Sequence, residues 1–389
     1  MHSEIDYAAE YDNSARVANS SQLINKYITD AANFREVASN PAQLNLAYGN
    51  SERNMMDIFW PNNSDGREHK SPIVMFIHGG YWQRMDRSCF SHLAMGLNAH
   101  GVAVAMPSYS LCPDIDVDGI INELRRACLV LFQTYRKRLT VIGHSAGGHL
   151  AACMMATDWT RIHPMLPHDL VSSGMGISGL YDLQPLTQTP VNDALGLDNA
   201  AAIGASPVYW TPVAIQQFDA WVGGSESGEY HRQSRELSAR WNLLGTPTRY
   251  VSVPDANHFT IVDELVDPDS PMIRRILNLL QKPQAHIDLP ELDNDEVDAL
   301  VARYVEESQS DLEPAVEAPS LESPIWPPQD EDDAAEQKSG LVMPPEAKPR
   351  PSSKASSKAR RKARALAEKE PEKTAGRDEE DAAAQEQAE

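Results

Sequence analysis

The stretch LTVIGHSAGGHL, residues 139–150, decides the fold of this chain. Its first six residues are an apolar run typical of a buried strand, and the residues that follow, beginning HLAACMMA, predict a helix. The junction reads GHSAG, the pattern GxSxG, with Ser145 at its centre. A sharp strand-to-helix turn that projects a serine hydroxyl needs small residues two positions to either side. The stretch therefore predicts Ser145 as a nucleophile at the end of a buried strand.

Apolar runs on both sides of this stretch predict a large sheet. Runs without polar alternation are typical of strands covered on both faces, and parallel strands need a crossover between them. Segments with helical periodicity supply these crossovers, at 88–100, 117–137, 229–243 and 260–281, and parts of residues 1–48 are also expected to be helical. The chain is therefore expected to form a doubly wound, mostly parallel α/β sheet, with strands at 55–61, 72–77, 102–107, 139–144, 172–180, 218–224 and 248–253.

The composition divides the 389 residues into a body and a tail. Residues 1–283 carry six of the seven tryptophans and a net charge of −8, and they predict one domain. A Pro- and Thr-rich insertion at about 182–212 is expected to form a small cap over the carboxyl edge of the sheet, where such folds bind ligands. Residues 284–389 are rich in Pro, Ala, Glu and Lys, carry a net charge of −14, and predict a mostly disordered tail with alternating acidic and basic blocks.

Charge, cysteines and hydropathy exclude several classes of function. An acidic body repels nucleic acid and anionic membranes, so neither is an expected partner. No apolar stretch is long enough to span a bilayer, and the acidic amino terminus lacks the features of a signal peptide. The four cysteines show no CxxC pair and predict reduced thiols in a cytoplasmic protein. The sequence leaves a homodimer open.

A second glycine motif follows the strand expected at 72–77. His78-Gly79-Gly80 allows the backbone to approach a substrate carbonyl closely and to turn its N–H groups toward a developing oxyanion. We expect the donors to be Gly79, Gly80 and Ala146, with the N–H of Tyr81 as an alternative. Tyr81 and Trp82 are candidates for the wall of a substrate pocket, and core packing is the alternative for both.

The expected general base and its acid come later in the chain. In the α/β-hydrolase fold the catalytic residues follow the order Ser, acid, His, so the histidine after the last strand, His258, is the expected base. The acid follows the strand at 218–224. Glu226 is the favoured candidate, because a carboxylate there can accept the imidazole Nδ1–H. Glu229 at the start of the next helix and Asp255 remain alternatives.

These motifs together resemble the kynurenine formamidase (arylformamidase) group, which lies close to esterases of the hormone-sensitive-lipase type. The resemblance rests on HGGYW, GHSAGGHL, SGLYDLQPL at 178–186, GGSESGEYHRQS and the NHF around His258, and it covers residues 11–280. It implies Ser145, Glu226 and His258 as the triad, although the animal formamidases carry aspartate where Glu226 stands. The group includes bacterial carboxylesterases, so it does not fix the substrate.

The expected function is therefore that of a serine hydrolase acting on a small-molecule acyl amide or ester. An arylformamidase-like activity on an N-formylkynurenine type of substrate is favoured, a short-chain carboxylesterase is the alternative, and a catalytically inactive binding module is a third hypothesis. No metal motif, phosphate-binding loop or dinucleotide fingerprint is present, so neither a metal nor a cofactor is expected.

Overall fold

The structure is a computed structural model that describes residues 5–37, 41–62, 71–212, 216–281, 296 and 299–303. Its centre is an eight-stranded sheet with the strand order β1-β2-β4-β3-β5-β6-β7-β8. β2 pairs antiparallel with both β1 and β4, and all the other neighbours are parallel. The strands are β1 (Ala42–Ala47), β2 (Met55–Phe59), β3 (Ile73–Ile77), β4 (Ala103–Pro107), β5 (Leu139–His144), β6 (Val171–Ile177), β7 (Gln217–Gly223) and β8 (Thr248–Val253).

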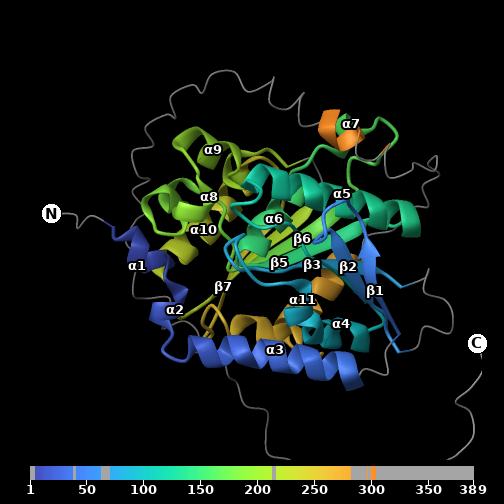
Figure 1. Ribbon diagram of the computed structural model, residues 1–389, viewed down its shortest axis with the longest axis horizontal. Coiled ribbons are helices and arrows are strands. Elements are labelled where there is room, and N and C mark those ends of the chain that lie inside the picture. Colours follow the sequence, from blue (N-terminus) through green and yellow to red (C-terminus); the bar gives the residue numbers. More distant parts are fainter. Residues whose placement is uncertain are drawn as a thin grey trace, which may run out of the picture. The chain divides into compact units, whose positions relative to one another are not determined.

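Helices cover both faces of the sheet (Figure 1). One face packs against α5 (Val117–Tyr135), α6 (Ala146–Met155) and α10 (Gly228–Leu243). The other packs against α3 (Ser20–Val37), α4 (Met95–Ala99), α11 (Pro271–Leu280) and the 3₁₀ helix η2 (Arg87–Ala94). Because both faces are covered, β3, β4 and β5 are buried at every position, which explains their continuous apolar runs.

The structure confirms the doubly wound, mostly parallel sheet and all seven expected strands to within a few residues. Helix α5 shows why its periodicity was informative. Its expected apolar stripe, which includes Ile120, Leu124 and Leu131, is buried against the sheet. Asp116 caps the helix by accepting a hydrogen bond from the amide of Gly119 at 2.7 Å.

The insertion at 182–212 contains four short helices among the described residues. They are η3 (Gln184–Gln188), α8 (Asn192–Leu195), α9 (Asn199–Gly204) and η4 (Pro207–Tyr209). This cap follows β6, so it lies on the side of the sheet where the parallel strands end. Three further helices are short. α1 (Tyr7–Tyr11) and α2 (Asn13–Arg16) precede α3, and α7 (Trp159–Ile162) lies between α6 and β6.

Three expectations about the elements were wrong in detail. The single helix expected at 260–281 is divided into η5 (Ile261–Leu265) and α11, because Pro268 and Pro271 interrupt it and Ser270 caps the second part. The helix expected at 88–100 begins as the 3₁₀ helix η2 and becomes α-helical only at Met95. Strand β1 was not expected, although its sequence AQLNLA alternates apolar and polar residues; it is a short, mostly exposed edge strand with an irregular register.

A buried carboxylate joins α3, β2 and η2. Asp57 is 1% exposed on β2 and forms ion pairs with Arg35 and Arg87. It also accepts a hydrogen bond from the amide of Asn45 at 2.8 Å. A buried charge with several donors of this kind is costly to leave unpaired, so the three elements depend on one another.

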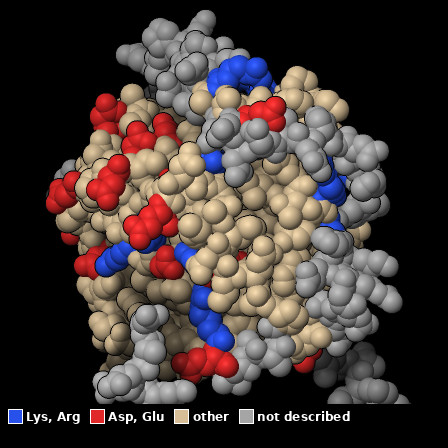
Figure 2. Space-filling view, turned by 45° about the vertical axis from the view of Figure 1, so that its right-hand side comes forward, with Lys and Arg blue, Asp and Glu red and all other residues tan. Residues whose placement is uncertain are grey.

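The described residues all belong to one unit, residues 1–319. Residues 299–303 are helical, and Val301 packs into the larger core cluster with 7% of its surface exposed. Apart from these residues and Glu296, the tail expected at 284–389 lies outside the described residues. On the face shown in Figure 2, acidic side chains gather along one side and the basic ones are scattered, which agrees with the acidic composition.

Candidate active site

Ser145 lies at the turn between β5 and α6, where the sequence placed it. Its backbone has φ 57° and ψ −122°, a conformation that few non-glycine residues adopt. A Cβ at Gly143 would lie 2.0 Å from the carbonyl oxygen of Gly147, and one at Gly147 would lie 2.0 Å from that of Ile77. The two glycines are therefore required by the close approach of three backbone segments, and the turn holds the Ser145 side chain at the sheet's edge.

His258 faces Ser145 from the loop after β8. Its Nε2 lies 3.1 Å from Ser145 Oγ, although 113 residues separate the two in sequence. The turn that holds it is closed by Asn257, whose Oδ1 accepts from the amides of Phe259 and Thr260. His144 donates from its Nε2 to the carbonyl oxygen of His258 at 2.8 Å. Burial and the nearby His258 hold the pKa of His144 well below its usual value, so its ring is a neutral support.

Glu226 lies on the other side of the His258 ring. Its Oε2 is 2.7 Å from His258 Nδ1, which therefore carries the proton and leaves Nε2 free to accept from the serine hydroxyl. Its Oε1 accepts from Ser178 Oγ at 2.5 Å and from the amide of Gly223 at 2.7 Å. The carboxylate is thus held at both oxygens, and only 1% of its side chain is exposed.

The two alternative acids lie elsewhere. Glu229 is buried at the start of α10, where its carboxylate accepts from Tyr11 Oη at 2.8 Å and pairs with Arg232 at 2.9 Å. Asp255 is an exposed turn residue with φ 60°. Among the described residues, neither forms a hydrogen bond with His258. The structure therefore brings Ser145, His258 and Glu226 together and leaves the other two outside.

The HGG loop after β3 packs directly on Ser145. A Cβ at Gly79 would lie 2.9 Å from that of Ser145, and Gly80 has φ 115°, so both positions need glycine. Within the described part of the chain, the amides of Gly79, Gly80, Tyr81 and Ala146 donate to no protein acceptor. These are the amides that the sequence predicted as donors to an oxyanion.

Tyr81 and Trp82 have different environments. Tyr81 lines the cavity in front of Ser145, and its hydroxyl donates to the carbonyl oxygen of Tyr11 at 2.6 Å and lies 2.8 Å from Tyr230 Oη. Trp82 is completely buried, and its ring packs edge-on against His149 with centroids 5.1 Å apart. The structure therefore places Tyr81 in the cavity wall and Trp82 in the core, which is the alternative that the sequence left open for Trp82.

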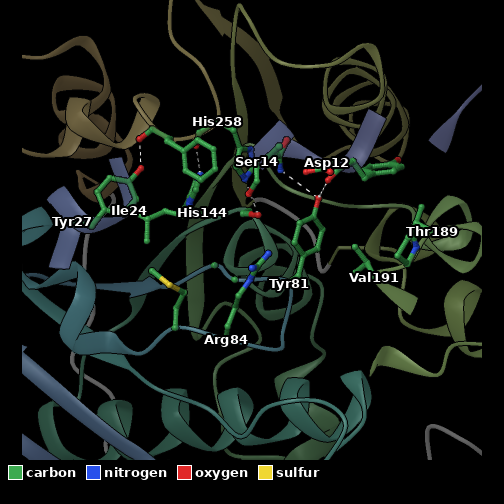
Figure 3. A pocket seen from close by; sticks show the side chains of 18 of the residues that line it. Asp12, Ser14, Ile24, Tyr27, Tyr81, Arg84, His144, Thr189, Val191 and His258 are labelled. Carbon is green, nitrogen blue, oxygen red and sulfur yellow. Dashed lines mark hydrogen bonds between the residues drawn. The ribbon is translucent and has the colours of Figure 1, made fainter. Parts of the chain in front are cut away.

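The cavity in front of Ser145 has a volume of about 310 Å³. Figure 3 shows side chains from three separate regions turned toward it. The HGG loop and the turn after it form one wall, the cap forms a second with Thr189, Pro190 and Val191, and the amino-terminal arm forms a third. The arm residues are Ala8, Tyr11, Asp12, Asn13, Ser14, Ile24 and Tyr27.

Sequence reasoning missed the arm and also Arg84, Met85 and Phe90 in the other wall. No local pattern could have found the part of the arm that precedes α3, because α1 and α2 are only five and four residues long and reach the site through long-range contacts. Asn13 shows this, since its Nδ2 donates to Tyr230 Oη at 2.7 Å across 217 residues.

Within the described residues, no group of three or more His, Cys, Asp or Glu side chains is arranged to hold a metal ion. In the same part of the chain, no helix has the length and apolar character needed to cross a membrane. All four cysteines are free thiols.

Comparisons with known proteins find several hydrolases that are related to this chain. A family model named BD-FAE matches residues 56–171. The kynurenine formamidase of Danio rerio is 30% identical over 246 residues, which cover 61% of this chain and 82% of that protein. The kynurenine formamidase of Salmo salar is 30% identical over 270 residues, covering 67% and 90%.

Among solved structures, a protein from Silicibacter sp. TM1040, provisionally described as a thioesterase, is 31% identical with a TM-score of 0.61, covering 70% of this chain and all of that one. Esterase B from Lactobacillus rhamnosis, at 18% identity and a TM-score of 0.52, shares the fold. The chain therefore belongs to the kynurenine formamidase family of α/β-hydrolases, and it is an enzyme that hydrolyses amide or ester bonds.

Proposed function

We propose that Ser145, His258 and Glu226 form the catalytic triad of an arylformamidase-like hydrolase, which cleaves a small N-formyl aryl amide such as N-formylkynurenine. The observation that carries the proposal is the continuous chain of contacts from Ser145 Oγ to His258 Nε2, at 3.1 Å, and from His258 Nδ1 to Glu226 Oε2, at 2.7 Å. Such a chain activates a hydroxyl by giving it a base and by holding that base in the correct tautomer.

The first half of the reaction forms an acyl-enzyme. Ser145 Oγ attacks the formyl carbon while His258 Nε2 takes the hydroxyl proton. The carbonyl oxygen becomes an oxyanion, and the unpaired amides of Gly79, Gly80 and Ala146 are placed to donate to it, with that of Tyr81 as the alternative. When the C–N bond breaks, the leaving amine nitrogen takes the proton from His258, and the formyl group remains on Ser145.

The second half repeats these steps with water. His258 Nε2 takes a proton from a water molecule, whose oxygen attacks the formyl ester. The second oxyanion uses the same amides, and Ser145 Oγ regains its proton as the ester bond breaks. The products are formate and the free aryl amine. Glu226 keeps its charge throughout and stabilises the imidazolium that forms in each half.

An aromatic leaving group fits the walls of the cavity. Five aromatic side chains line it and offer edge and face contacts to a ring: Tyr11, Tyr27, Tyr81, Phe90 and Phe259. The Danio rerio and Salmo salar relatives, both called kynurenine formamidases, support the same substrate class. A short-chain carboxylesterase is the second candidate, because the same machinery cleaves esters and Esterase B shares the fold.

Steady-state kinetics separates the candidates. We expect a higher kcat/KM for N-formylkynurenine than for p-nitrophenyl acetate, and no turnover of either by Ser145→Ala. The reverse order would favour a carboxylesterase. A fluorophosphonate probe should label the wild type and Ser234→Ala, a control that removes a buried serine hydroxyl from α10. Failure to label the folded wild-type protein would instead support a binding module.

The remaining proposals concern the enzyme's substrate and compartment, its domain organisation and its oligomeric state. We expect a small-molecule substrate and a reducing compartment such as the cytoplasm, which the four free thiols support. A hydrolase domain over residues 1–283 with a dispensable tail stays a prediction, tested by truncation. A homodimer also stays a prediction, and light scattering of the purified protein tests it.

A further inference from the structure

Arg84 lies in a tight turn that follows the HGG loop. The amides of Gln83 and Arg84 both donate to the carbonyl oxygen of Gly80, at 3.1 and 3.2 Å. The turn is fixed at two further points. Arg53 donates to the carbonyl oxygen of Met85 at 2.7 Å, and the Gln83 side chain donates to that of Val191 in the cap at 2.8 Å. The backbone that carries Arg84 is therefore held against both the HGG loop and the cap.

The Arg84 side chain points into the cavity (Figure 3). In the part of the chain that the structure describes, it forms no hydrogen bond and no ion pair. The neighbouring arginines differ, because Arg53 and Arg87 each have carboxylate and carbonyl or hydroxyl partners. Arg84 is thus a cation at the site whose five N–H donors are available to a ligand.

Among the described residues, only one other formally charged side chain lines the cavity. This is Asp12, which caps α2 through an Oδ1 contact with the amide of Ala15 at 2.9 Å and forms no ion pair with Arg84 among the described residues. A ligand with one carboxylate near Arg84 would find a complementary charge. A second carboxylate near Asp12 would be repelled.

The charge of Arg84 acts at the reacting end of the cavity. Burial raises the pKa of Tyr81, and the Arg84 cation is among the groups that oppose this rise. The Tyr81 hydroxyl contacts Tyr230, whose ring lies 4.8 Å from that of His258. A group bound to Arg84 is therefore within the same pocket as the scissile bond.

We infer that Arg84 binds a carboxylate on the leaving group of the substrate, and that the enzyme therefore prefers carboxylate-bearing aryl amides and esters to neutral ones. The planar guanidinium matches a carboxylate in a two-point contact, and no partner among the described residues must first be displaced. The placement of the carboxylate on the leaving group rests on the proposed function, because the acyl part of a formamide is only H–C=O and cannot carry a carboxylate.

Matched substrates test this inference. The leaving-group pairs are formanilide with 3-formamidobenzoate and phenyl acetate with 3-acetoxybenzoate. Monophenyl succinate, which carries its carboxylate on the acyl side, is also compared with phenyl acetate. The readout is the ratio of kcat/KM for the charged and the neutral member, which is independent of the amount of folded enzyme. Wild type, Arg84→Met and Arg84→Lys are compared. Arg249→Met is the control, because Arg249 is exposed on β8 and does not line the cavity.

We expect wild type and Arg249→Met to favour the charged leaving group by about tenfold or more, mainly through a lower KM. Arg84→Met should reduce the ratio to about one, and Arg84→Lys should retain part of it, because lysine keeps the charge and loses the two-point contact. An equal ratio in wild type and Arg84→Met would overturn the inference. A ratio that changes only for monophenyl succinate would overturn the leaving-group assignment.

The two proposals fail in different ways. If no formamide is cleaved, the arylformamidase proposal fails, and the ester pair still measures the contribution of Arg84. If formamides are cleaved without a charge preference, the arylformamidase proposal stands and the role of Arg84 fails.

Discussion

Glu226→Gln is the substitution that tests the proposed triad most directly. In the wild type, Oε1 of Glu226 accepts from Ser178 Oγ and from the amide of Gly223, while Oε2 accepts from His258 Nδ1. A glutamine in the same place must turn its oxygen toward the two donors that hold Oε1. Its NH₂ group then faces His258 Nδ1 and donates to it.

This arrangement forces the wrong tautomer on His258. With Nδ1 accepting, the ring proton moves to Nε2, which then donates to Ser145 Oγ instead of accepting from it. The base is lost although the side chains keep their positions. The corresponding Asp-to-Asn change in serine proteases lowers kcat by about 10⁴. We expect the same order here, which corresponds to about 5 kcal/mol of transition-state stabilisation.

The assay is steady-state hydrolysis of p-nitrophenyl acetate at saturation, with Ser145→Ala as the background and a urea unfolding curve to show that each variant folds. Glu229→Gln is the matched control, because its carboxylate contacts Tyr11 and Arg232 and not the imidazole. It should keep kcat within about threefold. A kcat for folded Glu226→Gln within about tenfold of wild type would refute the tautomer argument and reopen the choice of acid.

Two further substitutions and a pair of truncations test the fold. Asp57→Ala should lower the free energy of unfolding by about 3 kcal/mol, because two arginines lose their buried partner; a urea midpoint close to wild type would contradict this. Burial lowers the pKa of His92 to about 4, and both of its ring nitrogens lack a partner among the described residues. In the unfolded state, the pKa of His92 is about 6.5, so the unfolded chain takes up a proton at a higher pH than the folded protein does. The free energy of unfolding therefore decreases as the pH falls from 6.5 toward 4. His92→Phe should consequently stabilise the protein by about 2 kcal/mol more at pH 5 than at pH 7.5. An equal effect at both pH values would count against a lowered pKa for His92 in the folded protein. A chain ending at residue 310 should match the full chain in urea unfolding and in kcat, whereas one ending at residue 290 should keep kcat but lose about 2 kcal/mol, because Val301 packs into the core.

The parts of the site that sequence reasoning predicted are those whose geometry demands particular residues nearby in the chain. Gly143 and Gly147 must lack side chains because backbone atoms approach to 2.0 Å of where a Cβ would be. The HGG loop has the same requirement at Gly79, which packs on Ser145. Such constraints appear in the sequence as short motifs at the ends of apolar runs, so Ser145 and the HGG loop could be placed with no knowledge of tertiary contacts. His258 was placed in another way, from its position after the last strand and the chain order of the fold.

The choice between Glu226 and Glu229 could not be made in this way. The two lie three residues apart after the same strand, and both are nearly buried. What separates them is the turn after β7, in which the amide of Glu226 donates to the carbonyl oxygen of Gly223 and its side chain folds back onto that residue's amide. Glu229 lies in the first turn of α10, and its carboxylate contacts Tyr11 of the amino-terminal arm. The sequence favoured Glu226 from its position at the end of the strand and left Glu229 open, because no sequence pattern shows the direction in which each side chain turns.

The pocket wall was the least predictable part, for a physical reason that also bears on specificity. The arm reaches the site through single contacts across the whole chain, such as Tyr11 Oη to Glu229 and Asn13 Nδ2 to Tyr230 Oη. These contacts need only a polar atom at the right place, so several residue types would serve, and no motif results. The glycine turns around Ser145 are compatible with few substitutions, whereas the side chains of the arm and of Arg84 form no hydrogen bond with Ser145, His258 or Glu226 among the described residues. Substrate preference within this family should therefore vary with these two segments, while Ser145, His258 and the amides around them supply the same chemistry.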